Sequence, residues 1–242
     1  MRDTALWAVV VAALAVLVNA SVSIFLHFRR AGFEEALATR KFDYDVSLAK
    51  RKAALDYLSA YHQRRQELAG EILAAFYEVQ RMMPTIRSPG SLGGVEGSSR
   101  PRPGVKEAPE VERTRDAYYR TIERLDENRK TIVRFLSKQF TAMALIGSEA
   151  GKPFEEFYQL LNRIIGSANM LIMTAGNDLS PPLTEKWHAD IWEGYVVPED
   201  QVQIQLNKIT EAIEAICKPI LSAKAPALSD INSDHPSSGT AR

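Results

Sequence analysis

One uncharged apolar segment near the N-terminus constrains this chain more than any other feature. Residues 5–28 contain no Asp, Glu, Lys or Arg, and most of them are Ala, Val, Leu, Ile or Phe. A helix of this length would extend for about 36 Å, and the hydrocarbon core of a bilayer is about 30 Å thick. The segment therefore predicts a single transmembrane helix, preceded by a short segment at residues 1–4.

A cleaved signal peptide is the alternative interpretation of the same segment. Val18, Asn19 and Ala20 resemble the small-residue site at which such peptides are cut. However, Asp3 offsets Arg2, so the N-terminal region lacks the basic character of a signal peptide. The apolar run also continues beyond that site, and we therefore expect a retained helix.

The distribution of Lys and Arg predicts the orientation of this helix. Arg2 precedes the apolar segment, whereas Arg29 and Arg30 follow it at once, and further basic residues lie at 40–41 and 50–52. Because the side richer in Lys and Arg stays in the cytoplasm, we expect the N-terminus outside and the C-terminal domain inside. Arg29 and Arg30 then become membrane-interface anchors beside the lipid bilayer. The Ala- and Arg-rich composition suggests a bacterial inner membrane.

Residues 29–83 predict a long stalk helix that continues directly from the membrane. They are mainly strong helix formers, and no proline occurs before Pro84. A heptad frame places apolar residues in eight of eleven positions from Leu48 to Met83, as expected for a helix that packs along one face. The three polar positions of this frame are Arg51, His62 and Arg65. They indicate either a solvated face or residues that determine register and partner.

The segments flanking the C-terminal helices predict disorder. Residues 84–109 contain five Pro, five Gly and four Ser, a composition typical of a linker. Residues 219–242 are rich in Ser, Pro and Ala and predict a disordered tail.

The remaining residues, 110–218, predict a helical bundle. Apolar residues recur at helical spacing in several segments, and no stretch shows the alternation of a strand. The expected helices span about 110–146, 153–175, 184–194 and 198–217. The predicted fold is thus all-α, with a four-helix, coiled-coil-like bundle joined to the stalk.

Few residues suggest chemistry. Lys plus Arg and Asp plus Glu both number 30, and this neutral balance argues against nucleic acid as a partner. The only cysteine, Cys217, cannot form an internal disulfide. Glu185 and His188 share the ExxH spacing of metal-binding bundles, but the spacing occurs once, so packing is the favoured role of His188. We therefore assign no catalytic, cofactor-binding or metal-binding residue, and no cofactor.

Two tryptophans are the remaining candidates for binding. Trp187 and Trp192 either pack their helix onto the bundle or form a hot spot for a partner. With Arg51, His62 and Arg65 they make up the candidate partner-binding residues. The expected function is that of a membrane-anchored helical scaffold or interaction protein, which binds a helical partner or a second copy. A signal-transducing membrane sensor is one alternative, and a metal-dependent bundle enzyme is another.

Overall fold

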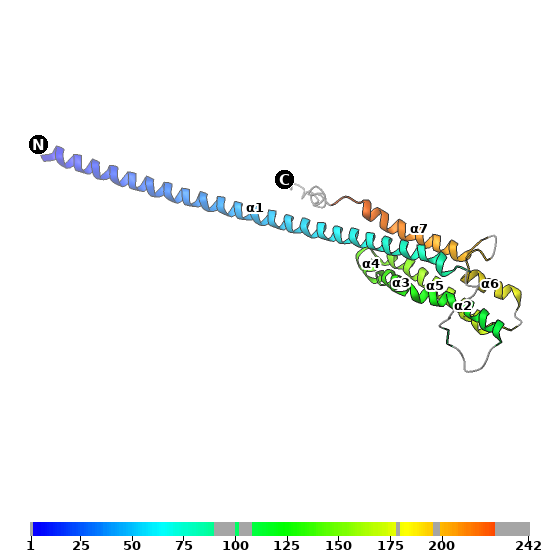
Figure 1. Cartoon of the computed structure of the whole chain (residues 1–242). Helices are drawn as coiled ribbons and strands as arrows, with labels where there is room; N and C mark the ends of the chain where they lie inside the picture. The colour runs from blue at the N-terminus through cyan, green and yellow to red at the C-terminus, as the bar shows by residue number, and fades with distance from the viewer. Residues whose placement is uncertain (1, 90–99, 102–107, 178–179, 196–198, 226–242) are drawn as a thin grey trace. The chain divides into compact units, whose positions relative to one another are not determined.

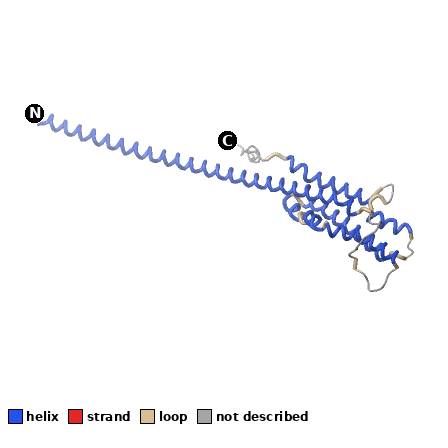
Figure 2. Tube along the Cα trace, viewed as in Figure 1, coloured by secondary structure: helices blue, strands red, loops and turns tan. Residues whose placement is uncertain are grey.

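The computed structural model describes residues 2–89, 100–101, 108–177, 180–195 and 199–225. Within α1 the side chains of residues 2–16, 18 and 31 are not described. Helices and the loops between them make up the whole described part, without a strand (Figure 2). The all-α prediction is therefore confirmed.

The helices follow one another along the chain as labelled in Figure 1. They are α1 (Arg2–Ile86), α2 (Pro109–Glu127), α3 (Arg129–Leu136), α4 (Gln139–Leu145), the 3₁₀ turn η2 (Ser148–Gly151), α5 (Lys152–Thr174), α6 (Pro181–Ile191) and α7 (Gln201–Ser222). The chain divides into two compact units. The first holds α1 as far as Ala60, and the second is Tyr61–Ala225.

The second unit is a helical bundle, as predicted. The C-terminal turns of α1, the series α2 to α4, and the helices α5 and α7 lie side by side in it (Figure 1). Helix α5 contacts α2, α6 and α7 and so occupies a central place. Its predicted range, 153–175, is close to the observed Lys152–Thr174.

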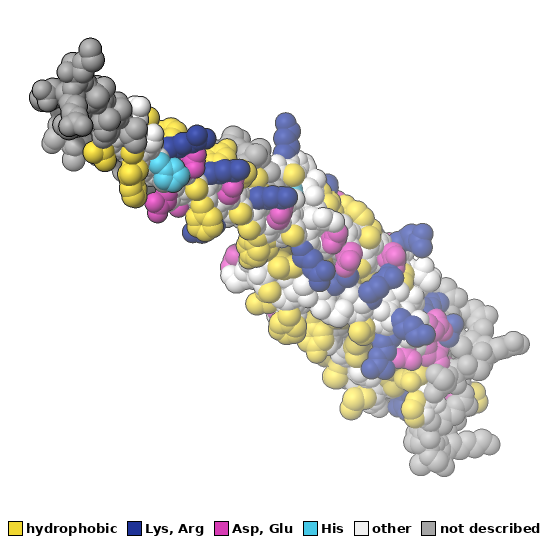
Figure 3. All heavy atoms as spheres, turned by 90° about the vertical axis from the view of Figure 1, so that its left-hand side faces the viewer, with side chains coloured by type: hydrophobic (Ala, Val, Ile, Leu, Met, Phe, Trp, Pro, Cys, Tyr) yellow, Lys and Arg dark blue, Asp and Glu magenta, His cyan; other side chains and the backbone are white. Residues whose placement is uncertain are grey.

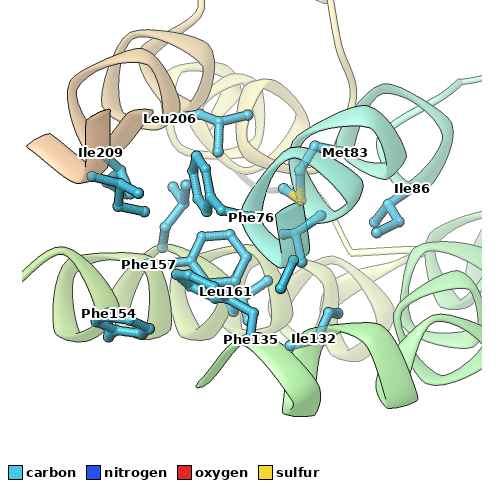
Figure 4. Packing of buried hydrophobic residues seen from close by; sticks show 14 of the residues in the cluster. Phe76, Met83, Ile86, Ile132, Phe135, Phe154, Phe157, Leu161, Leu206 and Ile209 are labelled. Atoms are coloured by element: carbon cyan, nitrogen blue, oxygen red, sulfur yellow. The ribbon is translucent and has the colours of Figure 1, made fainter. Parts of the chain in front are cut away.

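Phenylalanine rings from three helices form the centre of the bundle (Figure 4). Phe135 of α3 stacks on Phe154 of α5, with ring centroids 4.6 Å apart. Phe76 of α1 lies 5.2 Å from Phe135 and meets Phe157 edge to face at 6.1 Å. Offset and edge-to-face contacts of this kind stabilise a core beyond the area that they bury.

The bundle begins earlier in the chain than predicted. The heptad positions of α1 from residue 69 to residue 86 are all at most 2% exposed. They are Ala69, Ile72, Phe76, Val79, Met83 and Ile86. Residues 61–86 therefore belong to the bundle that was expected to span only 110–218, because their apolar stripe is covered by other helices of the same chain.

Several helix ends differ from the predicted ones. The expected helix 110–146 is interrupted at Asn128, whose side-chain Nδ2 donates a hydrogen bond to the Arg124 carbonyl, as Asn often does at helix ends. Helices α1 and α7 continue past Pro84 and Pro219. A proline so near the end of a helix removes one backbone hydrogen bond, and burial of the following Ile86 offsets that loss.

Besides Ile86 at the end of α1, the predicted linker, 84–109, holds two buried arginines, Arg87 and Arg100. The prediction of a disordered connection is therefore wrong at these positions, because both arginines pair with carboxylates of the bundle. Residues 90–99 and 102–107 of this linker lie outside the described residues, as does 226–242 of the predicted tail.

Among the residues whose side chains are described, no helix is apolar over a length sufficient to cross a membrane. The predicted transmembrane helix, 5–28, falls largely outside these residues, since the side chains of residues 2–16 and 18 are not described. It stays a prediction.

Candidate interaction surfaces

The first unit exposes an apolar stripe along α1, here called the α1 stripe. It consists of the apolar heptad positions between residues 37 and 58, namely Leu37, Tyr44, Leu48, Leu55 and Leu58. Leu37, Tyr44 and Leu48 are 49%, 66% and 53% exposed. Apolar side chains and charged ones alternate on the surface of this helix (Figure 3). The stripe occupies the same frame as the buried positions of residues 69–86, but four of its five residues are exposed and only Leu55 is half-buried.

Three of the candidate partner-binding residues lie in this frame. Arg51 is exposed and occupies the heptad position between Leu48 and Leu55 of the α1 stripe. His62 and Arg65 are half-buried in the second unit, where the Arg65 guanidinium lies 5.7 Å from the centre of the Tyr61 ring. Nε2 of His62 and Nε of Arg65 are buried without a hydrogen-bond partner among the described residues. The structure thus does not bring Arg51 together with the other two.

The expected membrane-interface residues are both exposed. Arg30 donates a hydrogen bond of 2.9 Å to Glu34, one turn further along α1, and both side chains are largely in solvent. Exposed pairs of this kind contribute only a few tenths of a kcal/mol, about 0.3–0.5. Arg29 is likewise exposed.

The second unit carries an aromatic cluster that the sequence did not predict. It consists of Tyr118 of α2 with His188, Trp192 and Tyr195 at the end of α6. The rings of His188 and Trp192 stack with centroids 5.0 Å apart and planes 4° apart. Trp192 is 5% exposed, so packing describes it better than a surface hot spot. Trp187 is half-buried and also packs against the core.

A hydrogen bond joins His188 to Tyr118 within this aromatic cluster. Its Nε2 lies 2.9 Å from the Tyr118 hydroxyl. Its Nδ1 and the Nε1 of Trp192 are buried and have no hydrogen-bond partner in the described part of the chain. Burial lowers the pKa of His188 and is the main cause that raises the pKa of Tyr118. Burial therefore favours the neutral form of each group.

This arrangement predicts a loss of stability in mild acid. In the unfolded chain His188 has the ordinary histidine pKa of about 6.5, and in the folded chain its pKa is lower. The folded protein therefore binds fewer protons, and the stability associated with neutral His188 is complete above about pH 6.5 and is lost as the pH falls toward the lower, folded pKa. We expect wild-type protein to lose more stability between about pH 7.5 and 5 than His188→Gln, measured by urea unfolding. Equal losses in the two proteins would contradict the role of His188.

A buried arginine joins three segments of the bundle. The Arg87 side chain is 2% exposed and forms a two-point ion pair with Asp200, through Nη1 at 2.9 Å and Nη2 at 3.0 Å. It also donates hydrogen bonds to the backbone carbonyls of Ala189 and Asp190. Asp200 in turn caps the N-terminus of α7 by accepting from two backbone N–H groups. The sequence carried no signal for this pair, because 113 residues separate its partners.

The described residues offer little reactive chemistry. No group of three His, Cys, Asp or Glu side chains among them is placed to hold a metal ion. Burial raises the pKa of Cys217 to about 11, which keeps the thiol protonated. A polar groove of about 300 Å³ lies between α1 and the α3–α4 region. Within it Lys138 pairs with Glu71 and thereby lowers the pKa of that carboxylate.

Comparisons with models of protein families, with curated proteins and with solved structures find no match to this chain.

Proposed function

We propose that this chain is a membrane-anchored interaction protein whose α1 stripe binds a helical partner. In this proposal residues 5–28 cross a bilayer and the bundle from Tyr61 onward lies in the cytoplasm. The observation that carries the proposal is the change in burial along one heptad frame of α1. The frame is buried from residue 69 to residue 86, whereas from residue 37 to residue 58 all its positions are exposed except the half-buried Leu55.

Physical chemistry favours covering the α1 stripe. Moving a leucine side chain from water into a packed interface contributes about 1.5–3 kcal/mol. Leu48 and Leu58 are 53% and 39% exposed, so about half or less of this free energy per leucine is still available to a partner. Helices also derive most of their stability from packing an apolar face. A second helix laid along the stripe would supply that packing.

The cytoplasmic side is supported by the basic residues that follow the apolar segment. Arg29 and Arg30 come directly after it, and Arg40 and Lys41 lie within the distance over which Lys and Arg set orientation. A helix that leaves the bilayer here would place the α1 stripe close to the membrane surface. There it could bind another membrane protein or a second copy.

Photo-crosslinking in intact cells tests this function. A photoreactive phenylalanine analogue at Leu48 lies on the α1 stripe, whereas the same analogue at Tyr57, which is 71% exposed, lies off it. We expect a discrete adduct from position 48 and at least roughly fivefold less from position 57, because partner burial is confined to one helix face. The chain should also remain in the membrane pellet after an alkaline wash.

Equal labelling from both positions would contradict a partner on the stripe. Release of the chain by the alkaline wash would contradict the anchor.

A further inference from the structure

We propose that the partner of the α1 stripe is a second copy of this chain, aligned in parallel, with Arg40 of each copy paired to Asp45 of the other. This inference rests on the proposed function, since it names the occupant of the same surface. It follows from the register of the stripe, from the charges that flank it and from the shared membrane.

The register is known from the bundle. There the spacing between successive buried positions alternates between three and four residues, from Ala69 and Ile72 to Met83 and Ile86. In heptad notation Ala69 is a position a and Ile72 is a position d. Counting back by sevens makes Leu48 and Leu55 positions a, and Leu37, Tyr44 and Leu58 positions d.

The flanking charges complement each other in a parallel pair. Arg40 precedes an a position and is therefore a position g, while Asp45 follows a d position and is a position e. In a parallel two-stranded coiled coil, residue g of one helix approaches residue e of the next heptad in the other, five residues further on. Arg40 and Asp45 are separated by that interval. Neither side chain forms an ion pair within the described chain.

Two charged layers interrupt the apolar seam. Lys41 lies at position a and Arg51 at position d, so each would meet its own copy across a parallel interface. A lysine at position a is a known device that sets register at a cost in stability. The long aliphatic stems of both side chains can cover the seam while their charges remain in water. The pair is therefore expected to be weak, and to depend on the two copies sharing one membrane.

The membrane also selects the parallel arrangement. Two copies whose apolar segments, residues 5–28, enter the same bilayer in the same orientation must present α1 in the same direction. An antiparallel pair would instead bring Asp45 opposite Lys52, both at position e. The two arrangements are distinguishable because they place different residues face to face.

Disulfide crosslinking of the full chain in native membranes tests the pairing. Position a of one helix faces position a of its copy in a parallel pair, so Leu48→Cys should form a disulfide-linked dimer under mild oxidation. The matched control is Tyr57→Cys, which lies off the stripe and should give at least roughly fivefold less dimer. The native Cys217 is buried and is not expected to react. Absence of a Leu48→Cys dimer, or equal yields from the two positions, would overturn the proposal.

Mixed crosslinking identifies the antiparallel arrangement. There Leu48 would face Arg51 of the other copy, so that coexpressed chains carrying Leu48→Cys and Arg51→Cys would form the mixed dimer in preference to either homodimer. That result would overturn the parallel pairing.

Charge exchange tests the register. In the Leu48→Cys background, Arg40→Glu and Asp45→Arg should each lower the dimer yield by roughly fivefold, because each sets like charges against one another at two symmetric sites. The double variant Arg40→Glu/Asp45→Arg should restore the original yield. Failure of this restoration would overturn the Arg40–Asp45 pairing.

A change at Arg51 separates the second copy from another partner. Arg51→Leu removes a like-charged layer and should raise the dimer yield if the occupant is a second copy. A fall in the dimer yield would show that Arg51 does not face its own copy, and would overturn the parallel second copy. Photo-adducts at position 48 together with no disulfide dimer would likewise leave the proposed function standing and reject only the second copy.

Discussion

Arg87→Met is expected to lower the free energy of unfolding by about 3–5 kcal/mol, the usual cost of removing one partner of a buried ion pair. Arg87 is 2% exposed, and the substitution leaves the Asp200 carboxylate without its two-point partner. It also leaves the carbonyls of Ala189 and Asp190 without their donor. Since Asp200 caps α7, the loss should affect the junction of α6 and α7 first.

Urea unfolding of the full chain in a mild detergent, followed by circular dichroism, measures this loss. Arg81→Met is the matched control, because Arg81 is exposed on the same helix and should change the free energy of unfolding by less than about 0.5 kcal/mol. Asp200→Asn retains a capping side chain but removes the negative charge. The losses from Arg87→Met and Asp200→Asn should therefore not add in the double variant. Additive losses would contradict a direct pair.

Phe135→Ala is expected to cost about 3–5 kcal/mol, as for other buried phenylalanines whose removal leaves a cavity. Phe135 is fully buried, and its ring contacts the rings of Phe76, Phe154 and Phe157. These rings come from α1, α3 and α5, so the cavity would lie where the three helices meet. A rigid core cannot collapse fully into such a space.

Phe140 provides the matched control for this substitution. It lies five residues further along and is 76% exposed, so Phe140→Ala should change the free energy of unfolding by less than about 0.5 kcal/mol. Both variants are measured by the same urea unfolding as the arginine variants. A loss from Phe135→Ala no larger than that from Phe140→Ala would show that the aromatic centre is not the main core.

Local pattern was enough to predict the helices. The spacing of Phe154, Phe157 and Leu161 predicted α5, and the heptad frame from Leu48 to Met83 predicted the face of α1 that is buried from residue 69 onward. Both depend on the helical period of 3.6 residues, which any helix expresses in its own sequence. Helix ends were less predictable, as Pro84 and Pro219 show, because packing beyond the proline outweighs one lost hydrogen bond.

Contacts between distant residues could not be predicted in this way. Arg87 lay in a segment whose composition indicated disorder, and the aromatic cluster joins Tyr118 to His188, 70 residues later. A sequence shows that a side chain is charged or aromatic, but its partner is chosen by the packing of whole helices. The same reason accounts for the missed breaks at Asn128 and after Leu136.

The sequence by itself determined that this chain is helical, that one face of α1 is largely apolar from residue 48 to residue 83, and that residues 5–28 carry no Asp, Glu, Lys or Arg. Only the tertiary structure decided which part of that face is covered. Helical period depends on neighbours three and four residues away, whereas burial depends on where other helices end. This face is buried from residue 69 to residue 86, whereas the α1 stripe, between residues 37 and 58, is exposed except at the half-buried Leu55.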